Sequence, residues 1–349
     1  MKQEKDLALY RKYRPKGWDE VLGQAHVVDA LAGAIKNKKV AHAYLFSGSR
    51  GTGKTSVARI LARELGTSDN DIYEIDAASN TGVDNIRELT EGVRTLPFDS
   101  AYKVYIIDEV HMLSKAAFNA LLKTLEEPPA HVIFILATTE LEKVLDTIVS
   151  RCQTFVFKRP TDAILKSFAL DIAKKEGMKL SSSGAELIAL LGDGSFRDTH
   201  GIIQKVASVS KDKAIDMAEI EAVTGAPSSV LVNAFIDAIA SKQIEKGIEA
   251  VHKAASQNID MKLFLKLILH KIRLVLLYRF APEMKKDIES ELSESDASFI
   301  KTIAADKSGA ISSKTILELL DMQKYQRDAF IAELPLELAL IDIIEQEKK

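Results

Sequence analysis

The fold of this chain is decided by the stretch Gly48-Ser49-Arg50-Gly51-Thr52-Gly53-Lys54-Thr55. It matches the pattern G-x-x-x-x-G-K-[ST], whose glycines let the backbone turn tightly and aim successive N–H groups at phosphate oxygens. Lys54 is then expected to reach the β- and γ-phosphates of ATP, and the Thr55 hydroxyl to ligate Mg²⁺. A strand is predicted before this stretch and a helix after it, which favours a phosphate-binding loop over a simple connecting turn. Ser56, in the first turn of that helix, belongs to the same predicted site, because a helix N-terminus attracts anions.

A second motif lies where the four apolar residues 104–107 lead directly into Asp108 and Glu109. Carboxylates at the end of a buried strand are costly unless they serve a cation. We expect Asp108 to hold Mg²⁺ through its hydration shell and Glu109 to polarise an attacking water. Alone, this pair is equally compatible with a strand that ends in an acidic loop. Together with the loop at 48–55, it indicates phosphoryl transfer from ATP to water.

Short apolar runs alternate with helical patterns through residues 1–160, which predicts an α/β domain with a mostly parallel sheet. Such sheets bind their ligands at the carboxyl ends of the strands. The predicted strands are Ala43–Phe46, Ile72–Asp76, Val104–Ile107, Val132–Leu136 and Phe155–Phe157, and the clearest helices are 54–65, 83–94 and 115–126.

Past Pro160 no further strands are predicted. Residues 161–225 are interpreted as three helices and residues 226–349 as a second all-helical region. The helix predicted at 260–281 is apolar around much of its circumference, so it needs neighbours on more than one side. We therefore expect three domains with boundaries near residues 160 and 225.

Composition narrows the class of protein. The 349 residues exceed the usual size of one domain, and a net charge of −3 argues against binding nucleic acid by bulk charge. Cys152 is the one cysteine, so an intramolecular disulfide and a zinc site built from several thiolates are both excluded. No uncharged stretch approaches the ~20 residues of a membrane span. These features predict a cytoplasmic globular protein with no membrane association.

Further blocks of sequence resemble AAA+ clamp loaders, and specifically the gamma/tau subunits of bacterial DNA polymerase III. The resemblance covers nearly all of residues 7–200, with several matched blocks in the same order. It implies an AAA+ ATPase domain, a small helical lid domain over 161–225 and an oligomerisation collar over 226–349. The matched blocks are Tyr10-Arg11-Lys12-Tyr13-Arg14-Pro15, 18–24, 74–83, Asp108-Glu109-Val110-His111 and 119–129.

The resemblance also implies roles for single residues in the nucleotide site. Tyr10, Arg14 and Pro15 belong to the segment that lines the adenine side of the site in this family. Thr139 corresponds to the sensor-1 residue that hydrogen-bonds near the γ-phosphate, although a hydroxyl at a strand end is commonly just a cap. Arg197, in Gly194-Ser195-Phe196-Arg197-Asp198, resembles the sensor-2 arginine, which contacts the nucleotide bound by its own subunit.

Ser150-Arg151-Cys152 resembles the motif with which clamp loaders insert an arginine finger into the neighbouring subunit's ATP site. A guanidinium suits that role because it spreads positive charge over a planar fork of donors. Taken alone, an arginine after a helix is more often a surface residue. Cys152 is interpreted as a small buried residue and not as a nucleophile.

The chain departs from the family pattern in three places. Residues 66–71 stand where gamma/tau subunits usually carry a four-cysteine zinc module, so we expect no zinc. Thr199-His200-Gly201 stands where the family tends to have apolar helix residues, which leaves the local packing open. Since the sequence does not include the segments that follow the third domain in tau, the resemblance leads us to expect a gamma-like form.

The resemblance implies a pentameric loader in which ATP binding opens a sliding clamp for primer–template DNA. The expected partners are delta-like and delta-prime-like subunits, further copies of this chain, the sliding clamp, and DNA contacted through its phosphates. Arg87 and Lys115 are candidate DNA contacts, although both are equally compatible with solvated helix charges.

Two other classes stay open. One is a non-hydrolysing stator subunit, which the intact residues Lys54, Thr55, Asp108 and Glu109 disfavour. The other is an AAA+ ATPase of different purpose, a helicase loader or branch-migration motor, which the blocks at 74–83 and 119–129 disfavour.

Overall fold

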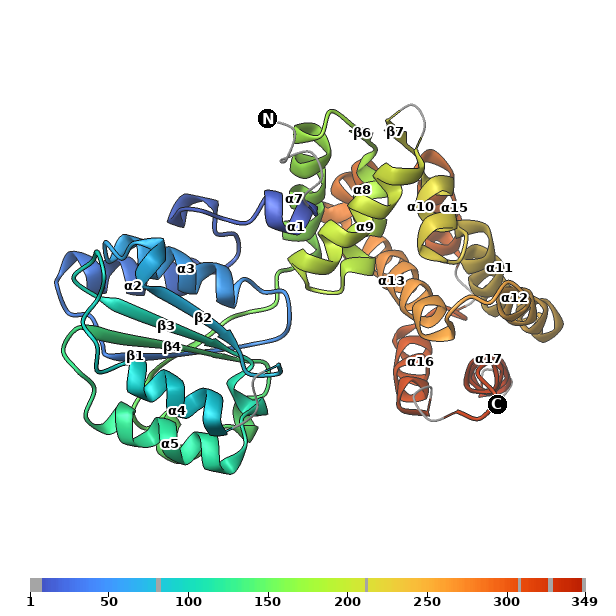
Figure 1. Ribbon diagram of the computed structural model, residues 1–349. Helices are drawn as coiled ribbons and strands as arrows, with labels where there is room; N and C mark the ends of the chain where they lie inside the picture. The colour runs from blue at the N-terminus through green and yellow to red at the C-terminus, as the bar shows by residue number, and fades with distance from the viewer. Residues whose placement is uncertain (1–7, 80–82, 211–212, 307–308, 326–328, 347–349) are drawn as a thin grey trace. The chain divides into compact units, whose positions relative to one another are not determined.

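A computed structural model describes residues 8–79, 83–210, 213–306, 309–325 and 329–346. The chain divides into two compact units (Figure 1). The first unit comprises Met1–Phe168 with Gly192–Gly201, and the second comprises Ala169–Leu191 with Ile202–Lys349. The predicted three-domain division stays a prediction.

The first unit is built on a five-stranded parallel sheet with the strand order β2-β3-β4-β1-β5. All five predicted strands are present, each within two residues of its expected bounds. Strand β1 is an inner strand that pairs with β4 on one side and β5 on the other, so the loop that follows it opens between these two neighbours at the carboxyl edge of the sheet. The strands are β1 (Ala43–Ser47), β2 (Ile72–Asp76), β3 (Lys103–Asp108), β4 (Val132–Thr138) and β5 (Gln153–Val156).

Helices cover both faces of this sheet, α2 and α3 on one face and α4 and α5 on the other (Figure 1). Successive residues of a strand point to opposite faces. Tyr44 and Phe46 accordingly pack with α2 and α3, whereas Leu45 packs with α4 and α5. Burial on both faces explains why these strands are continuous apolar runs. The helices are α2 (Ala25–Lys36), α3 (Lys54–Glu64), α4 (Val83–Gly92) and α5 (Lys115–Glu126).

Short helices complete the first unit at the sheet edge and at the start of the chain. They are α1 (Leu9–Lys12), η1 (Trp18–Glu20), η2 (Asp69–Asp71), η3 (Val110–Met112), η4 (Leu141–Lys143) and α6 (Asp146–Val149). The first part of α7 (Asp162–Lys175) and the first part of α9 (Phe196–Val209) also belong to this unit.

The connection at residues 66–71, which is short in this chain, is tied to the loop before β3. The Asp71 carboxylate is fully buried and accepts hydrogen bonds from the backbone N–H groups of Phe98 (2.5 Å) and Asp99 (2.8 Å). The backbone N–H of Ser68 donates to Ser100 Oγ at 2.7 Å. Because charge-assisted bonds to backbone N–H groups are strong, this connection is a fixed part of the sheet edge.

The described residues of the second unit are helical apart from one small parallel sheet. Two-residue strands β6 (Lys179–Leu180) and β7 (Ala214–Ile215) pair there, which corrects the expectation that no strand follows Pro160. Such short strands leave no alternation to recognise in a sequence. The described residues of the range 161–225 form four helices where three were predicted, because α10 (Met217–Thr224) is a separate element after α7, α8 (Ser182–Gly192) and α9.

The helix predicted at 260–281 is α13 (Met261–Phe280), and its prediction as a surrounded helix is confirmed. Neighbours include α11, α15 and α16, and Phe264, Ile268 and Ile272 are fully buried. No single helix in the described ranges is long and apolar enough to cross a membrane, while the pair α10 and α11, bent by 89°, reaches that length and composition together. The remaining elements are α11 (Ser229–Ala240), α12 (Ile244–Ser256), η5 (Pro282–Met284), α14 (Lys285–Glu291), α15 (Glu294–Ala305), α16 (Ser313–Tyr325) and α17 (Leu334–Gln346).

Candidate functional site

The loop at 48–55 connects the carboxyl end of β1 to the first turn of α3, as the sequence predicts. Gly48, Gly51 and Gly53 all have positive φ angles, of 146°, 75° and 102°. Only glycine adopts such conformations without strain. A Cβ on Gly51 would also lie 2.0 Å from Ser195 Oγ. Both the backbone conformation and the space around this residue therefore favour glycine. The backbone is therefore shaped to turn its N–H groups into one cradle.

Lys54 lies buried inside this cradle, with 5% of its surface exposed. Its Nζ donates to the carbonyl oxygens of Gly48 (2.7 Å) and Ser49 (3.0 Å). Burial lowers the pKa of the Lys54 ammonium, while Glu109 and Asp108 act to raise it. Among the described residues, the buried Ser49 hydroxyl has no hydrogen-bond partner. A buried cation and a donor without a partner in one glycine-rich loop fit the phosphates of a nucleotide.

The predicted Mg²⁺ ligands lie side by side. Thr55 Oγ1 donates to Asp108 Oδ2 at 2.7 Å, which joins the start of α3 to the end of β3. Asp76, at the end of β2, pairs in register with Asp108. A hydroxyl and carboxylates at this edge are the oxygen ligands that Mg²⁺ prefers. The residues present therefore fit Mg²⁺ held with a nucleotide.

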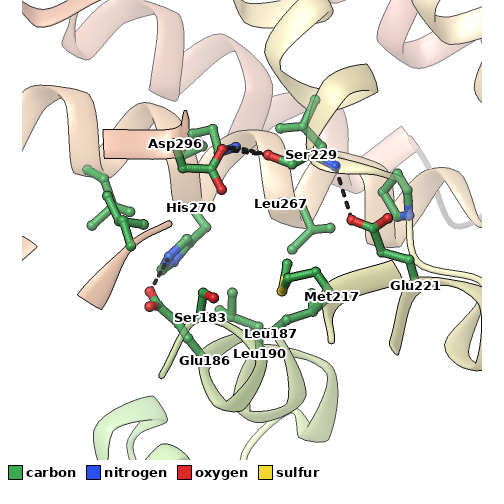
Figure 2. Close-up of a pocket in the computed structure, with 15 residues that line it drawn as sticks. Ser183, Glu186, Leu187, Leu190, Met217, Glu221, Ser229, Leu267, His270 and Asp296 are labelled. Atoms are coloured by element: carbon green, nitrogen blue, oxygen red, sulfur yellow. Dashed lines mark hydrogen bonds and ion pairs between the residues drawn. The ribbon is translucent and has the colours of Figure 1, made fainter. Parts of the chain in front are cut away.

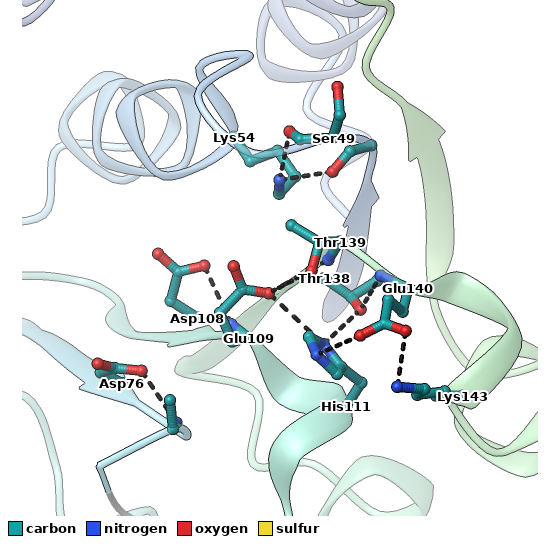
Figure 3. A network of polar contacts seen from close by, with 12 residues as sticks. Ser49, Lys54, Asp76, Asp108, Glu109, His111, Thr138, Thr139, Glu140 and Lys143 are labelled. Carbon is teal, nitrogen blue, oxygen red and sulfur yellow. Dashed lines mark hydrogen bonds and ion pairs between the residues drawn. The ribbon is translucent and has the colours of Figure 1, made fainter. Parts of the chain in front are cut away.

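Glu109 has its carboxylate fixed by the residue predicted as sensor 1. Its Oε2 accepts from the Thr139 backbone N–H at 3.2 Å and from Thr139 Oγ1 at 3.0 Å (Figure 3). Glu109 also adopts a left-handed backbone conformation, with φ at 49°, which is uncommon for a residue other than glycine. Such strain is frequent at functional sites, where it sets the direction of a side chain.

The N-terminal segment and the predicted sensor 2 meet in the first unit. The Arg197 guanidinium lies over the Tyr10 ring, 5.1 Å from its centroid. The pKa of Arg14, which is half-buried, is lowered by burial first and then by the positive charge of Arg59, with a further contribution from Arg197. Pro15 follows Arg14 and is also half-buried. A group of positive charges gathered around Arg14 is suited to bind an anion.

His200 resolves the packing that the sequence left open. Its ring stacks with Tyr13 at 6.3 Å and meets Phe168 edge to face at 4.7 Å. Nδ1 bonds the Phe196 carbonyl at 3.0 Å, and burial lowers the pKa of the ring to about 4. The neutral imidazole therefore acts as an aromatic core residue that joins the N-terminal segment to α7 and α9.

Arg151 follows α6 and makes its contacts away from the loop at 48–55. Its guanidinium pairs with Glu126 at 2.7 Å and donates to the Thr147 carbonyl at 2.8 Å. A third of its side chain is exposed. The neighbouring Cys152 packs against the hydrophobic core, and burial raises the pKa of its thiol to about 12, which suppresses the thiolate that a nucleophile needs.

Some residues of the site were not assigned a role from the sequence. Gln24 is fully buried and bonds both the backbone N–H (3.1 Å) and the carbonyl (2.7 Å) of Lys158. The Phe196 backbone N–H donates to the Gly51 carbonyl at 3.0 Å, which attaches α9 to the glycine loop. Both residues stand in blocks that resemble the family, Gln24 in 18–24 and Phe196 in 194–198, so the sequence did contain a signal for them. Of the two candidate DNA contacts, Lys115 is exposed at the start of α5, and the side chain of Arg87 lies outside the described part of the structure.

The second unit holds a separate cavity of about 80 Å³ (Figure 2). Leucines and Met217 line much of it, and Glu186 bonds His270 at its edge at 3.2 Å. Lys271 also lines the cavity, and its Nζ contacts Asp296 (2.7 Å), Ser229 (2.7 Å) and Asn233 (2.8 Å). All three donors of this ammonium are therefore satisfied by the protein itself.

The known proteins that this chain is similar to include subunits of bacterial DNA polymerase III. The family model described as "DNA polymerase III, delta subunit" matches residues 23–80 and 67–161. DNA polymerase III subunit tau of Bacillus subtilis is 40% identical over 303 residues, which cover 81% of this chain and 54% of that protein. Subunit tau of Escherichia coli is 37% identical and covers 76% of this chain and 45% of that protein. The chain thus spans about half the length of the relatives it matches.

Solved structures with a similar fold include the Thermotoga maritima RuvB Holliday junction branch migration motor. The TM-score is 0.52 and the identity 23%, over 65% of this chain and 79% of that one. At this identity the likeness concerns the fold alone. Together with the parallel sheet and the helical region after it, it confirms the predicted AAA+ fold class.

Proposed function

Because this chain belongs to the family of the DNA polymerase III gamma/tau subunits, we propose that it is an ATP-driven motor subunit of a bacterial clamp loader. In this role it opens a sliding clamp and loads it onto primed DNA. The single observation that carries the proposal is the cluster of Lys54, Thr55, Asp108, Glu109 and Thr139 at one edge of the sheet.

Each residue of that cluster has a defined task in the proposal. Lys54 and the backbone N–H groups of the 48–55 loop hold the phosphates of ATP. Thr55 and Asp108 hold Mg²⁺, which neutralises charge on the phosphates when it is bound. Glu109 accepts a proton from the attacking water, and Thr139 orients that carboxylate.

The base and ribose of ATP are held on the adenine side by the N-terminal segment. Tyr10, Arg14 and Pro15 line this side of the site. Arg197 reaches the nucleotide of its own subunit, and its position over Tyr10 supports that task. Because Arg197 is carried on α9, a change in nucleotide would be transmitted to the helices that follow.

Hydrolysis at each site depends on a neighbouring subunit in this proposal. Arg151 leaves Glu126 and enters the adjacent ATP site, where its guanidinium stabilises the charge of the transition state. Residues 226–349 form the oligomerisation collar, and residues 161–225 form the lid. The partners are delta-like and delta-prime-like subunits, further copies of this chain, the sliding clamp and the phosphates of primer–template DNA.

The remaining attributes follow from the same role. The protein acts in the cytoplasm and uses ATP and Mg²⁺ without zinc. It contributes no polymerase site of its own. A stator that does not hydrolyse ATP, and an AAA+ ATPase of different purpose, are the alternatives that the experiment must separate.

The test is ATP hydrolysis by the chain with delta-like and delta-prime-like subunits, with and without sliding clamp plus primed DNA. We expect strong stimulation by clamp and DNA. Arg151→Ala should lose that stimulation by about 10³-fold or more while ATP still binds, because an arginine finger contributes at least that much. Arg63→Ala, which removes an exposed arginine paired with Asp69, is the matched control and should hydrolyse normally.

Other outcomes identify the alternatives. ATP binding with no hydrolysis in any mixture would indicate a stator. Hydrolysis that ignores the clamp and is unchanged in Arg151→Ala would leave the ATP site standing and contradict the clamp-loading role.

A further inference from the structure

His111 lies at the edge of the nucleotide site between two carboxylates. Its side chain is 5% exposed. Nδ1 is 3.5 Å from Glu109 Oε2, and Nε2 is 3.3 Å from Glu140 Oε1 (Figure 3). Nδ1 is also 3.0 Å from Thr138 Oγ1. The imidazole therefore bridges the residue that follows β3 and the residues that end β4.

The far side of this bridge is itself fixed. The Glu140 backbone N–H donates to Thr138 Oγ1 at 3.0 Å, and the Glu140 carboxylate pairs with Lys143 at 2.7 Å. This pairing with Lys143, followed by smaller effects that include His111, holds the pKa of the Glu140 carboxyl below its usual range. Glu140 is therefore an ionised and anchored acceptor for Nε2.

The sheet brings these residues together. Ile107 pairs with Leu136 in register, so the segments that leave β3 and β4 run side by side at the carboxyl edge. One turn of η3 (Val110–Met112) then directs His111 back toward Thr138. An imidazole enclosed in this way has few alternative rotamers. Its fixed position in turn restrains the side chains that it contacts.

Two segments of the chain approach the same oxygen of the Glu109 carboxylate. Thr139 donates to Oε2 twice, and His111 approaches Oε2 from the other segment. In Figure 3 the other oxygen of Glu109 points away from both. With one oxygen restrained, the direction of the other is determined, and a general base works only when its oxygen meets the attacking water.

We infer that His111 is a positioning residue for hydrolysis, which restrains the Glu109 carboxylate by linking it to Thr138 and Glu140. The inference rests on the proposed ATPase function and adds a residue to it. His111 does not bind the nucleotide in this role, so its loss should lower kcat and leave the affinity for ATP unchanged.

The test compares three substitutions of His111 in the assembled complex with clamp and primed DNA. His111→Ala removes both contacts. In His111→Asn, the amide stands close to the place of Nδ1 and retains the contact toward Thr138 and Glu109, whereas His111→Gln places its amide near Nε2 and retains the contact toward Glu140. We expect kcat to fall about 10- to 100-fold in His111→Ala, as is typical when a group that orients a reactive side chain is removed.

The difference in kcat between His111→Asn and His111→Gln distinguishes a positioning role from a purely structural one. His111→Asn should recover most of kcat, because it keeps the contact on the side of Glu109, and His111→Gln should recover less. The Kd for ATP should stay within about twofold of wild type in all three variants. His42→Asn, at an exposed histidine of the same unit, is the matched control and should leave kcat unchanged.

Several results would overturn the inference. They are a kcat within twofold of wild type in His111→Ala, a loss of ATP affinity that accounts for the defect, or an equal loss in His111→Asn and His111→Gln. If His111→Ala does not fold, as circular dichroism would show, the comparison of His111→Asn with His111→Gln still decides. A wild-type complex that hydrolyses no ATP would contradict the proposed function, whereas unchanged kcat in the variants of an active complex contradicts only the role of His111.

Discussion

Lys54 in the first unit and Lys271 in the second are both buried lysines, with 5% and 9% of their surfaces exposed. Lys271 forms an ion pair with Asp296 and also contacts Ser229 and Asn233. Among the residues that the structure describes, Lys54 contacts only neutral carbonyl oxygens at hydrogen-bond distance, and the nearby carboxylates act on it from farther away. The buried ammonium of Lys271 thus has its charge balanced by a carboxylate in direct contact, whereas the charge of the Lys54 ammonium is only partly balanced.

This difference separates a structural charge from a functional one. A buried charge needs an opposite charge close by, and Lys271 has it within the protein. Lys54 would gain such a partner only from a bound anion, so its burial is favourable in the nucleotide-bound state. Substitutions of the two lysines should therefore affect different properties of the protein.

The largest effect is expected for Lys54→Met. Loss of the ammonium should lower ATP hydrolysis by about 10³-fold or more, because it removes a preorganised positive charge from the phosphates. The melting temperature should stay the same or rise, since the substitution removes a cation that burial disfavours. A hydrolysis assay and thermal melting measure these two quantities. Normal hydrolysis, or a large fall in melting temperature, would contradict the functional interpretation of this lysine.

The reverse pattern is expected for Lys271→Met. It leaves the Asp296 carboxylate buried without its ammonium, which typically costs about 3–5 kcal/mol. Hydrogen exchange of the buried amides of α13 should speed up accordingly, while ATP affinity in the first unit stays within about twofold of wild type. Adding Asp296→Leu should restore most of the protection, because replacing both partners of a buried pair is often neutral. Lys262→Met, at an exposed lysine of the same helix, is the control.

The two lysines also show what could be predicted from sequence. Lys54, Thr55, Asp108 and Glu109 could be predicted as site residues because they stand in short local patterns that follow apolar strands, and the structure brings them to one edge of the sheet. Lys271 was not found, because its partners lie on other helices and no local pattern brings them together. A lysine within an apolar helix looks the same in sequence whether it is paired or exposed.

The same distinction holds for the fold and for the rest of the site. The five strands of the main sheet were predicted because burial on both faces makes them continuous apolar runs. Strands β6 and β7 were missed because each has two residues. His111 was visible in its motif, but its link to Glu140 depends on the pairing of β3 with β4, which only the folded chain shows.

The smallest expected effect concerns His200, whose packing role could not be predicted from the sequence. Burial lowers the pKa of its ring from 6.5 to about 4 in the folded protein. Between these two pH values the unfolded chain takes up a proton that the folded chain does not, so stability falls as the pH is lowered from 6.5 to 4 and is unaffected above 6.5. The loss at pH 4 amounts to about 3 kcal/mol.

His200→Leu removes the titrating group and keeps an apolar side chain between Tyr13 and Phe168. The melting temperatures of wild type and variant should lie close together at pH 7.5 and should separate progressively below pH 6.5, with the variant more stable. Replacing the exposed His42 with Gln is the control for the loss of a histidine elsewhere in the same unit. A constant difference at all pH values would mean that the ring of His200 is accessible to protons in the folded chain. The imidazole would then be a site of charge, like the lysine in the nucleotide loop, and not part of the core.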